Sequence, residues 1–218
     1  MTRYERKYRI DQLEPGLIEQ WVRHHPASFR PLHPERQINN VYFDTCDLAA
    51  YQQNLMGVAD RRKIRLRWYG EGATRMNAAQ LEIKSRSNET GSKEVILLGD
   101  VEWSDWSKLL KQVQRLQPSQ ELLPVLSNSY RRKYYGTGDR HFRLTVDRQL
   151  TYRGLWLHAG APDERLFARD PVAEEGVTIV ELKYEQSLDD RADHILQYIP
   201  FRQSRNSKYV NGVQLLYG

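Results

Sequence analysis

The sequence alternates apolar and charged residues along many short segments, which is the pattern of β-strands with one buried face. Residues 61–69, RRKIRLRWY, show the alternation most clearly. The pattern predicts strands over residues 3–10, 37–43, 61–69, 80–86, 94–98, 130–135, 142–147, 150–157 and 178–184. Helical spacing of apolar residues predicts helices only over residues 17–23, 105–116, 188–198 and 208–216. Strands therefore dominate, and the helices are too few to alternate with them in a parallel α/β sheet.

The charged half of these strands has an unusual composition. A Glu-x-Lys pair recurs on three predicted strands: Glu5 with Lys7, Glu82 with Lys84, and Glu181 with Lys183. Residues i and i+2 of a strand share a face, so each pair presents a carboxylate and an ammonium together. A charged face is usually a solvated one, but here Arg, Lys and Glu recur on strand after strand. The alternative is that these rows line a closed barrel, where a bound polyanion would compensate the cations.

Phosphate chemistry uses both kinds of charge found on these strands. Arginine binds phosphate through two parallel hydrogen bonds, and lysine binds it as a point charge. Carboxylates among the cations can hold a hard divalent ion that bridges phosphate oxygens. The strand faces are therefore compatible with a site for a phosphate chain and a metal ion.

Composition excludes several other classes of protein. The chain has 218 residues, 39% hydrophobic and 28% charged, so a packed core is expected. No apolar stretch approaches the roughly 20 residues of a membrane span, and no secretory signal follows the first residues. The single cysteine excludes an internal disulfide and a cysteine-cluster zinc site. We therefore predict a single cytoplasmic domain over residues 1–218.

The charge balance indicates an anionic partner other than nucleic acid. The chain carries 33 Lys and Arg against 28 Asp and Glu, a net charge of +5. Nucleic-acid-binding domains usually carry a denser basic block, so no nucleic-acid partner is expected. Membrane insertion is not expected either, and association with the inner face of a membrane would require a separate membrane protein. His24, His25 and His33 lie in a proline-containing stretch and are expected to be exposed loop histidines.

The chain resembles a known family nearly end to end, from Arg3 to about Leu216. The motifs that carry the resemblance are YERKY at 4–8, VYFDT at 41–45, IRLRWY at 64–69, LEIK at 81–84, Y-x-R at 130–132, R-x-T-x-D at 143–147, VELK at 180–183 and SKY at 207–209. Each motif alone is weak, but the whole set in this order is specific. The chain is similar to the polyphosphate polymerase domain of the vacuolar transporter chaperone (VTC) family, within the CYTH-like triphosphate tunnel metalloenzymes, and resembles its stand-alone bacterial form.

The resemblance implies a fold and a set of site residues. The expected fold class is α+β, a closed antiparallel β-barrel of about eight strands with a charged lumen and peripheral helices. The implied catalytic cations are Lys7, Arg65, Arg67, Lys84, Arg132, Arg143 and Lys183. The implied further substrate contacts are Tyr130, Lys93, Arg205, Ser207 and Lys208. Glu181 matches the family's metal-coordinating glutamate, and the further candidate ligands for Mn²⁺ or Mg²⁺ are Glu5, Glu82 and Asp147.

The implied activity is transfer of the γ-phosphate of ATP to a growing inorganic polyphosphate chain, with ATP and polyphosphate or triphosphate as the partners. Hydrolytic relatives open with Glu-x-Glu-x-Lys, whereas Arg3 stands at the first of these positions here, which favours the polymerase branch. Two other functions stay open. One is a tripolyphosphatase or nucleoside triphosphatase of the same superfamily, and the other is a non-catalytic module that binds polyphosphate or nucleotide.

Overall fold

The computed structural model describes residues 3–71, 75–87, 90–155 and 170–218. The chain divides into two compact units, each built from segments far apart in the sequence. Unit 1 comprises Met1–Arg36, Tyr130–Leu150 and Ala173–Asn206, and unit 2 comprises Gln37–Ser129, Thr151–Val172 and Ser207–Gly218. The prediction of one domain over the whole chain stays a prediction, and each unit is described by itself below.

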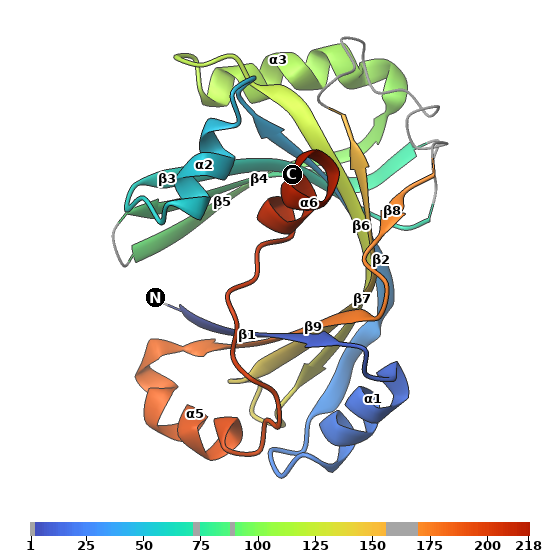
Figure 1. The fold of residues 1–218 in the computed structure, drawn as a ribbon, viewed down its shortest axis with the longest axis vertical. Coiled ribbons are helices and arrows are strands. Elements are labelled where there is room, and N and C mark those ends of the chain that lie inside the picture. Colours follow the sequence, from blue (N-terminus) through green and yellow to red (C-terminus); the bar gives the residue numbers. More distant parts are fainter. Residues whose placement is uncertain (1–2, 72–74, 88–89, 156–169) are drawn as a thin grey trace. The chain divides into compact units, whose positions relative to one another are not determined.

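The strands and helices include the segments that the alternation and the helical spacing predict (Figure 1), but the strands that contain residues 37–43, 80–86, 94–98 and 130–135 begin four to seven residues earlier than predicted. The strands are β1 (Arg3–Asp11), β2 (Arg30–Asp44), β3 (Arg61–Tyr69), β4 (Arg75–Ser87), β5 (Thr90–Glu102), β6 (Leu123–Gly136), β7 (Arg143–Gly154), β8 (Val172–Ala173) and β9 (Val177–Glu185). The described helices are α1 (Pro15–His24), α2 (Ala49–Leu55), α3 (Trp106–Leu116), α5 (Asp189–Leu196) and α6 (Lys208–Tyr217). Short α2 and β8 were not predicted as elements, since neither is long enough to show a period.

Two predicted strands are one strand in the structure. Strand β7 runs through the region predicted as separate strands over 142–147 and 150–157. Gln149 has a φ of 54°, a left-handed conformation that interrupts the regular alternation without ending the strand. The end of the second prediction, residues 156 and 157, lies outside the described residues.

The strands form an antiparallel sheet within an α+β fold. Their order is β1-β9-β7-β6-β2-β3-β4-β5, with β8 paired to β7. This order has two ends, β1 and β5, so the sheet of described residues is open, and the closed barrel expected from the resemblance is not confirmed. Among the described residues, no helix combines the length and apolar character needed to cross a membrane.

In unit 1, helices α1 and α5 pack on one face of strands β1, β9 and β7 (Figure 1). The strand residues buried there are the apolar half of each alternation: Tyr8, Ile10, Leu144, Val146, Val180 and Leu182. The helices contribute Ile18, Val22, Ala192 and Ile195. Full burial of such side chains contributes roughly 1.5–3 kcal/mol each. The opposite strand face is thereby left to the charged residues.

His25, which the sequence suggests is an exposed loop residue, is buried in this core with a side chain 3% exposed. Its Nδ1 accepts a hydrogen bond from the backbone N–H of Ala27 at 3.0 Å, so its Nε2 carries the proton and donates to the carbonyl of Ile195 at 3.2 Å. Burial lowers the pKa of His25, and the bond to Ile195 opposes that shift only partly. The imidazole is therefore neutral in the folded protein.

We expect acid to destabilise the fold through His25. Because its pKa is lower folded than unfolded, the unfolded chain binds the extra proton, and the unfolding free energy falls as pH drops below about 6.5. The slope due to His25 cannot exceed about 1.4 kcal/mol per pH unit, and it vanishes well above about pH 6.5, where His25 binds no proton in either state. Urea denaturation between pH 7.5 and 5.5 measures it. His25→Gln should reduce the pH dependence of the unfolding free energy. His24→Gln, the control at an exposed position, should leave it unchanged. Equal pH dependence in the wild type and His25→Gln would show that His25 does not contribute to it.

In unit 2, helix α3 covers the apolar face of β3 and β4. Trp106, Leu109 and Val113 project from α3 at helical spacing and are buried. The strand residues beneath them include Ile64, Leu66, Leu81 and Ile83. The same segments again leave their charged residues on the other face.

Asp44, at the end of β2, ties α2 and α6 to the sheet of unit 2. Its carboxylate accepts hydrogen bonds from the backbone N–H groups of Ala50 at 2.8 Å and Tyr51 at 3.0 Å, which lie in the first turn of α2. The same carboxylate accepts a hydrogen bond from the hydroxyl of Tyr209 on α6. The start of α6 therefore has a defined place on unit 2.

A glycine lets α6 approach the strands closely. A Cβ atom at Gly212 would lie 2.5 Å from Cδ1 of Tyr152 and 2.7 Å from a methyl of Leu126. No side chain fits at that distance. This contact and the Asp44–Tyr209 bond hold the helix whose first residues, Ser207 and Lys208, are among the candidate site residues.

Candidate functional site

The strand register gathers the charged residues of unit 2 on one sheet face. Arg65 of β3 pairs with Tyr42 of β2 and Glu82 of β4, and Arg67 pairs with Asn40 and Gln80. On the opposite face, the residues between them form the core beneath α3. The predicted alternation is thus confirmed in this unit, and it places three candidate residues, Arg65, Arg67 and Glu82, side by side.

Glu82 is the centre of a cluster of cations in unit 2. Its side chain is 2% exposed. Oε2 accepts hydrogen bonds from Arg65 Nε at 2.7 Å and from Arg65 Nη2. Oε1 accepts hydrogen bonds from Lys93 Nζ at 2.9 Å and Gln80 Nε2 at 2.8 Å, and lies 3.3 Å from Arg67 Nη1. One buried carboxylate thereby holds three cations from two neighbouring strands.

The charges of this cluster control one another's ionisation. Burial by itself would raise the pKa of Glu82, but Arg65, Arg67 and Lys93 outweigh it and lower that pKa to about 2. Burial also lowers the pKa of Lys93, and its bond to Glu82 opposes the shift. Glu82 is therefore ionised throughout the physiological pH range, and the cluster carries an excess of positive charge.

Two buried asparagines that the sequence did not single out support Arg67. Asn40 accepts a hydrogen bond from Arg67 Nε at 2.9 Å, and donates from its amide nitrogen to Asn128 Oδ1 at 2.8 Å. Both asparagines are at most 1% exposed. The amide nitrogen of Asn128 has no hydrogen-bond partner among the described residues. The sequence contained a signal for Asn40, because Asn40 and Tyr42 are two residues apart on β2 and therefore lie on the same face of the strand.

The remaining candidates of unit 2 lie on the same strands and on α6. Ser207 caps the N-terminus of α6, and its hydroxyl accepts a hydrogen bond from Lys63 Nζ at 3.1 Å. Lys63, also missed, lies on the charged face of β3 directly opposite Lys84, which is exposed. Lys208 is half-buried at the first position of α6.

In unit 1, Glu5, Lys7, Glu181 and Lys183 form one group of alternating charge. Lys7 pairs with Glu181 across β1 and β9, and Glu5 pairs with Lys183. Lys7 Nζ lies 3.7 Å from a carboxylate oxygen of each glutamate. Lys183 Nζ lies 3.3 Å from Glu181 and 3.7 Å from Glu5. The Glu5–Lys7 and Glu181–Lys183 pairs therefore lie side by side, because β1 and β9 are antiparallel neighbours in this register.

Arg132 extends this group from β6. Its guanidinium donates to both oxygens of Asp147 on β7, from Nε at 2.5 Å and from Nη2 at 2.7 Å. Nη2 also lies 4.0 Å from Glu181. Burial disfavours the charge of Arg132, but Asp147 outweighs burial and the pKa of Arg132 lies well above its ordinary value. Tyr130 is buried beside it, with its ring centroid 5.3 Å from the guanidinium carbon.

The other two candidates of unit 1 are exposed. Arg143 starts β7 opposite Lys183, and Arg205 lies in the segment before α6. That segment runs along β1, where Ser204 donates its backbone N–H to the carbonyl of Lys7 at 2.8 Å. Lys7 Nζ in turn donates to the carbonyl of Asn206 at 3.2 Å.

Unit 1 fits a divalent cation held largely by phosphate. Glu5 and Glu181 supply carboxylates, and Thr145, opposite Glu181 in register, has a buried hydroxyl without a hydrogen-bond partner among the described residues. No group of three or more His, Cys, Asp or Glu suited to a metal occurs in the described part of the chain. Mg²⁺ typically uses one or two carboxylates, waters and substrate phosphates, and this donor set suits that mode.

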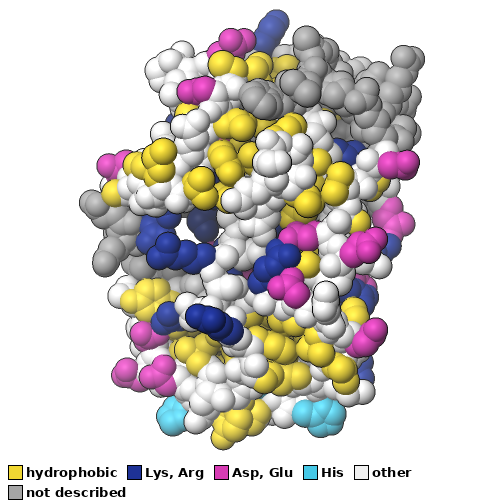
Figure 2. Space-filling model, viewed as in Figure 1, with side chains coloured by type: hydrophobic (Ala, Val, Ile, Leu, Met, Phe, Trp, Pro, Cys, Tyr) yellow, Lys and Arg dark blue, Asp and Glu magenta, His cyan; other side chains and the backbone are white. Residues whose placement is uncertain are grey.

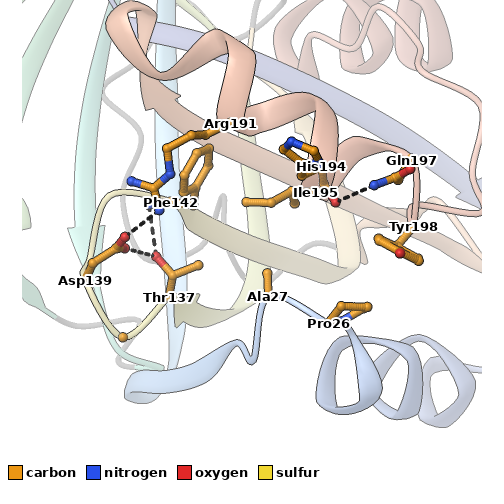
Figure 3. Close-up of a pocket in the computed structure, with 11 residues that line it drawn as sticks. Pro26, Ala27, Thr137, Asp139, Phe142, Arg191, His194, Ile195, Gln197 and Tyr198 are labelled. Carbon is orange, nitrogen blue, oxygen red and sulfur yellow. Dashed lines mark hydrogen bonds and ion pairs between the residues drawn. The ribbon is translucent and has the colours of Figure 1, made fainter.

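Two pockets of the described residues, one in each unit, do not include residues of the charged clusters. A pocket of about 510 Å³ lies in unit 1, between the loop carrying Asp139 and helix α5 (Figure 3). Arg191 at its wall is ion-paired with Asp139 at 2.8 Å and lies over the ring of Phe142. Hydrogen bonds from Thr137 and Arg191 lower the pKa of Asp139. The lining of this pocket contains none of the residues that the resemblance implies for phosphate binding.

The charged surface is mixed rather than uniformly basic. On the face drawn in Figure 2, dark blue Lys and Arg side chains lie among magenta Asp and Glu side chains. In both clusters the carboxylates likewise lie between cations. Each cluster therefore combines cations with carboxylates that lie between them.

Comparison with solved structures shows the same fold. The PH1819 protein of Pyrococcus horikoshii OT3 matches over 97% of this chain and 98% of its own, with a TM-score of 0.54 and 13% identity. A candidate adenylate cyclase of Vibrio parahaemolyticus matches over the same shares, with a TM-score of 0.55 and 12% identity. A candidate adenylate cyclase of Bacillus halodurans covers 100% of both chains, with a TM-score of 0.52 and 14% identity. At these identities the likeness concerns the fold alone.

Sequence comparison identifies the family. No curated protein matches the chain. The model of the VTC domain matches residues 2–217, nearly the whole chain. The match agrees with the motifs on the charged strand faces. The chain belongs to the VTC domain family.

Proposed function

We propose that this domain is a polyphosphate polymerase, which transfers the γ-phosphoryl group of ATP to a growing chain of inorganic phosphate. The VTC and CYTH-like domains are phosphate-related enzymes, which supports the general class. Arg3, in place of the first glutamate of the hydrolytic relatives, supports the polymerase over a triphosphatase. The tunnel expected from the resemblance is part of this proposal.

The observation that carries the proposal is the Glu82 cluster. Arg65, Arg67 and Lys93 contribute three positive charges against one negative charge, an excess of two. Cations held this close repel one another and lose hydration, and a phosphate chain would relieve both effects. A site of this kind binds an anion with several closely spaced charges better than one with a single charge.

We propose a set of phosphate-binding cations in each unit, taken by itself. In unit 1 these are Lys7, Arg132, Arg143 and Lys183, with Tyr130 and Arg205 as further contacts. In unit 2 they are Arg65, Arg67, Lys84 and Lys93, with Ser207 and Lys208 on α6. Within each unit, the proposed task of these residues is to bind phosphate groups and to neutralise charge as it moves between phosphorus centres.

Glu5 and Glu181 are the residues proposed to hold Mn²⁺ or Mg²⁺, with Thr145 beside them. When bound, the metal ion neutralises charge on the phosphate oxygens. Glu82 and Asp147, the other candidate ligands, each accept two hydrogen bonds from an arginine in this structure, and a metal role for them stays a prediction.

The reaction needs positioning more than proton transfer. An oxygen of the terminal phosphate of the chain, or of orthophosphate as primer, attacks the γ-phosphorus in line. The bond from the γ-phosphorus to the bridging oxygen breaks, and ADP leaves with that electron pair. The attacking oxygen is already anionic at neutral pH, so the residues of the site act by orientation and charge rather than as a general base.

Incubating the purified protein with ATP and Mn²⁺ tests the proposal. We expect a ladder of long polyphosphate on a gel, with one ADP released for each phosphate incorporated. Free phosphate in place of the ladder would identify a hydrolase. Neither product, with triphosphate still bound, would identify a binding module; both results would contradict the polymerase.

A further inference from the structure

Arg132 is held on several sides at once. Asp147 accepts two hydrogen bonds from its guanidinium in the parallel geometry that fixes the plane of an arginine. The rings of Tyr130 and Tyr134, two residues before and after it on β6, lie with centroids 5.3 Å and 6.0 Å from the guanidinium carbon. The side chains of Arg132 and Asp147 are 10% and 1% exposed.

We infer that Asp147 is a positioning residue, which holds the guanidinium of Arg132 in the orientation that binds phosphate. Both of its oxygens accept hydrogen bonds from Arg132, and the pair spans neighbouring strands β6 and β7. A long arginine side chain otherwise samples many rotamers, and fixing it before the substrate arrives lowers the entropy lost on binding. The inference rests on the proposed function, since it assigns Arg132 to phosphate.

A purely electrostatic role and a positioning role of Asp147 predict opposite effects of Asp147→Asn on triphosphate binding. Asp147→Asn removes a negative charge from an anion site, so electrostatics alone predicts tighter binding of triphosphate. If Asp147 positions Arg132, the same change weakens binding, because the asparagine amide nitrogen cannot accept the second hydrogen bond. Asp147→Glu keeps the charge and displaces the carboxylate by one methylene group. Loss of binding in Asp147→Glu therefore reports position alone.

Calorimetric titration of inorganic triphosphate into the full chain, in EDTA, measures this without turnover and without metal. We expect about tenfold weaker binding in both Asp147→Asn and Asp147→Glu, close to the lower limit for one hydrogen bond to a charged group. Asp139→Asn is the matched control, since it removes the same charge from the exposed pair with Arg191, and binding should not change. If Asp147→Asn does not fold, Asp147→Glu alone decides the question. Unchanged or tighter binding in Asp147→Glu overturns the inference.

A double-mutant cycle shows whether Asp147 acts through Arg132. We expect Asp147→Asn to have less than a twofold effect on triphosphate binding once Arg132→Ala is present, because nothing remains to be positioned. Losses that multiply would show that Asp147 acts independently and would overturn the inference.

A second readout separates this inference from the proposed function. The Nε–H of Arg132 should exchange with solvent at least about tenfold more slowly than the Nε–H of exposed Arg191, and Asp147→Asn should abolish this difference in rate. NMR measures both exchange rates, and the Arg132 signal is assigned by its absence in Arg132→Lys. Fast exchange of the Arg132 Nε–H in the wild type overturns the positioning role. Failure of the wild type to bind triphosphate, with slow exchange retained, overturns the proposed function instead.

Discussion

Arg65→Ala should reduce turnover of ATP by about 100- to 1,000-fold, the effect of removing one preorganised donor to a developing negative charge. Arg65 lies on the charged face of β3, and its guanidinium is fixed by Glu82 before substrate binds. The fold should persist, because Glu82 keeps Lys93 and Arg67 as partners. Steady-state rates of ADP release, with urea denaturation of the same preparation, measure both effects.

The matched control for this prediction is Arg75→Ala. Arg75 lies on β4 of the same unit and is ion-paired with Asp100 and Glu102, but its side chain is 51% exposed. Exposed ion pairs contribute about 0–1 kcal/mol, so neither turnover nor stability should change appreciably. Wild-type turnover in Arg65→Ala, or an equal loss in Arg75→Ala, would show that the Glu82 cluster is not the phosphate site.

Glu82→Ala should destabilise the protein by about 3–5 kcal/mol, the usual effect of removing one partner from a buried ion pair. The variant leaves the charges of Arg65, Arg67 and Lys93 close together without the carboxylate between them. Glu82→Gln, which keeps an acceptor oxygen, should lose less. A loss below about 1 kcal/mol in Glu82→Ala, measured by urea denaturation, would contradict the central place given to this residue.

We also expect the stabilisation by Glu82 to be lost in acid. The pKa of Glu82 is about 2 in the folded protein against an ordinary value of 4.5. Because the folded value is the lower one, the stabilisation is complete above about pH 4.5 and is lost as pH falls toward 2. The difference in unfolding free energy between wild type and Glu82→Gln should therefore shrink over that interval. A constant difference would show that the carboxylate is not stabilised by its cations.

The parts of the fold that local pattern predicts are those with a clear period. The segment 61–69 becomes β3 with the predicted bounds, and residues 106–116 become α3 with the predicted apolar face. Errors occur where a period is interrupted or absent. Gln149 breaks the alternation of β7 by one left-handed residue, and α2 is too short to show a helical stripe.

His25 illustrates the limit of local reasoning about burial. Neighbouring prolines suggested a loop, and the residue does directly follow α1. Its ring is nevertheless enclosed by residues distant in sequence, including Tyr198 and the carbonyl of Ile195. Only packing between α1 and the α5 region creates that environment.

The sequence by itself determined the strand alternation, the charged sheet face and the family, because side-chain parity and motif order are local properties of the chain. The tertiary structure decided which cation meets which carboxylate. Glu82 and Asp147 have the same appearance in the sequence as Glu5 and Glu181, yet in the structure they accept hydrogen bonds from Arg65 and Arg132. Register and strand order join residues that are far apart along the chain, so the sequence alone could not show which carboxylates accept hydrogen bonds from arginines.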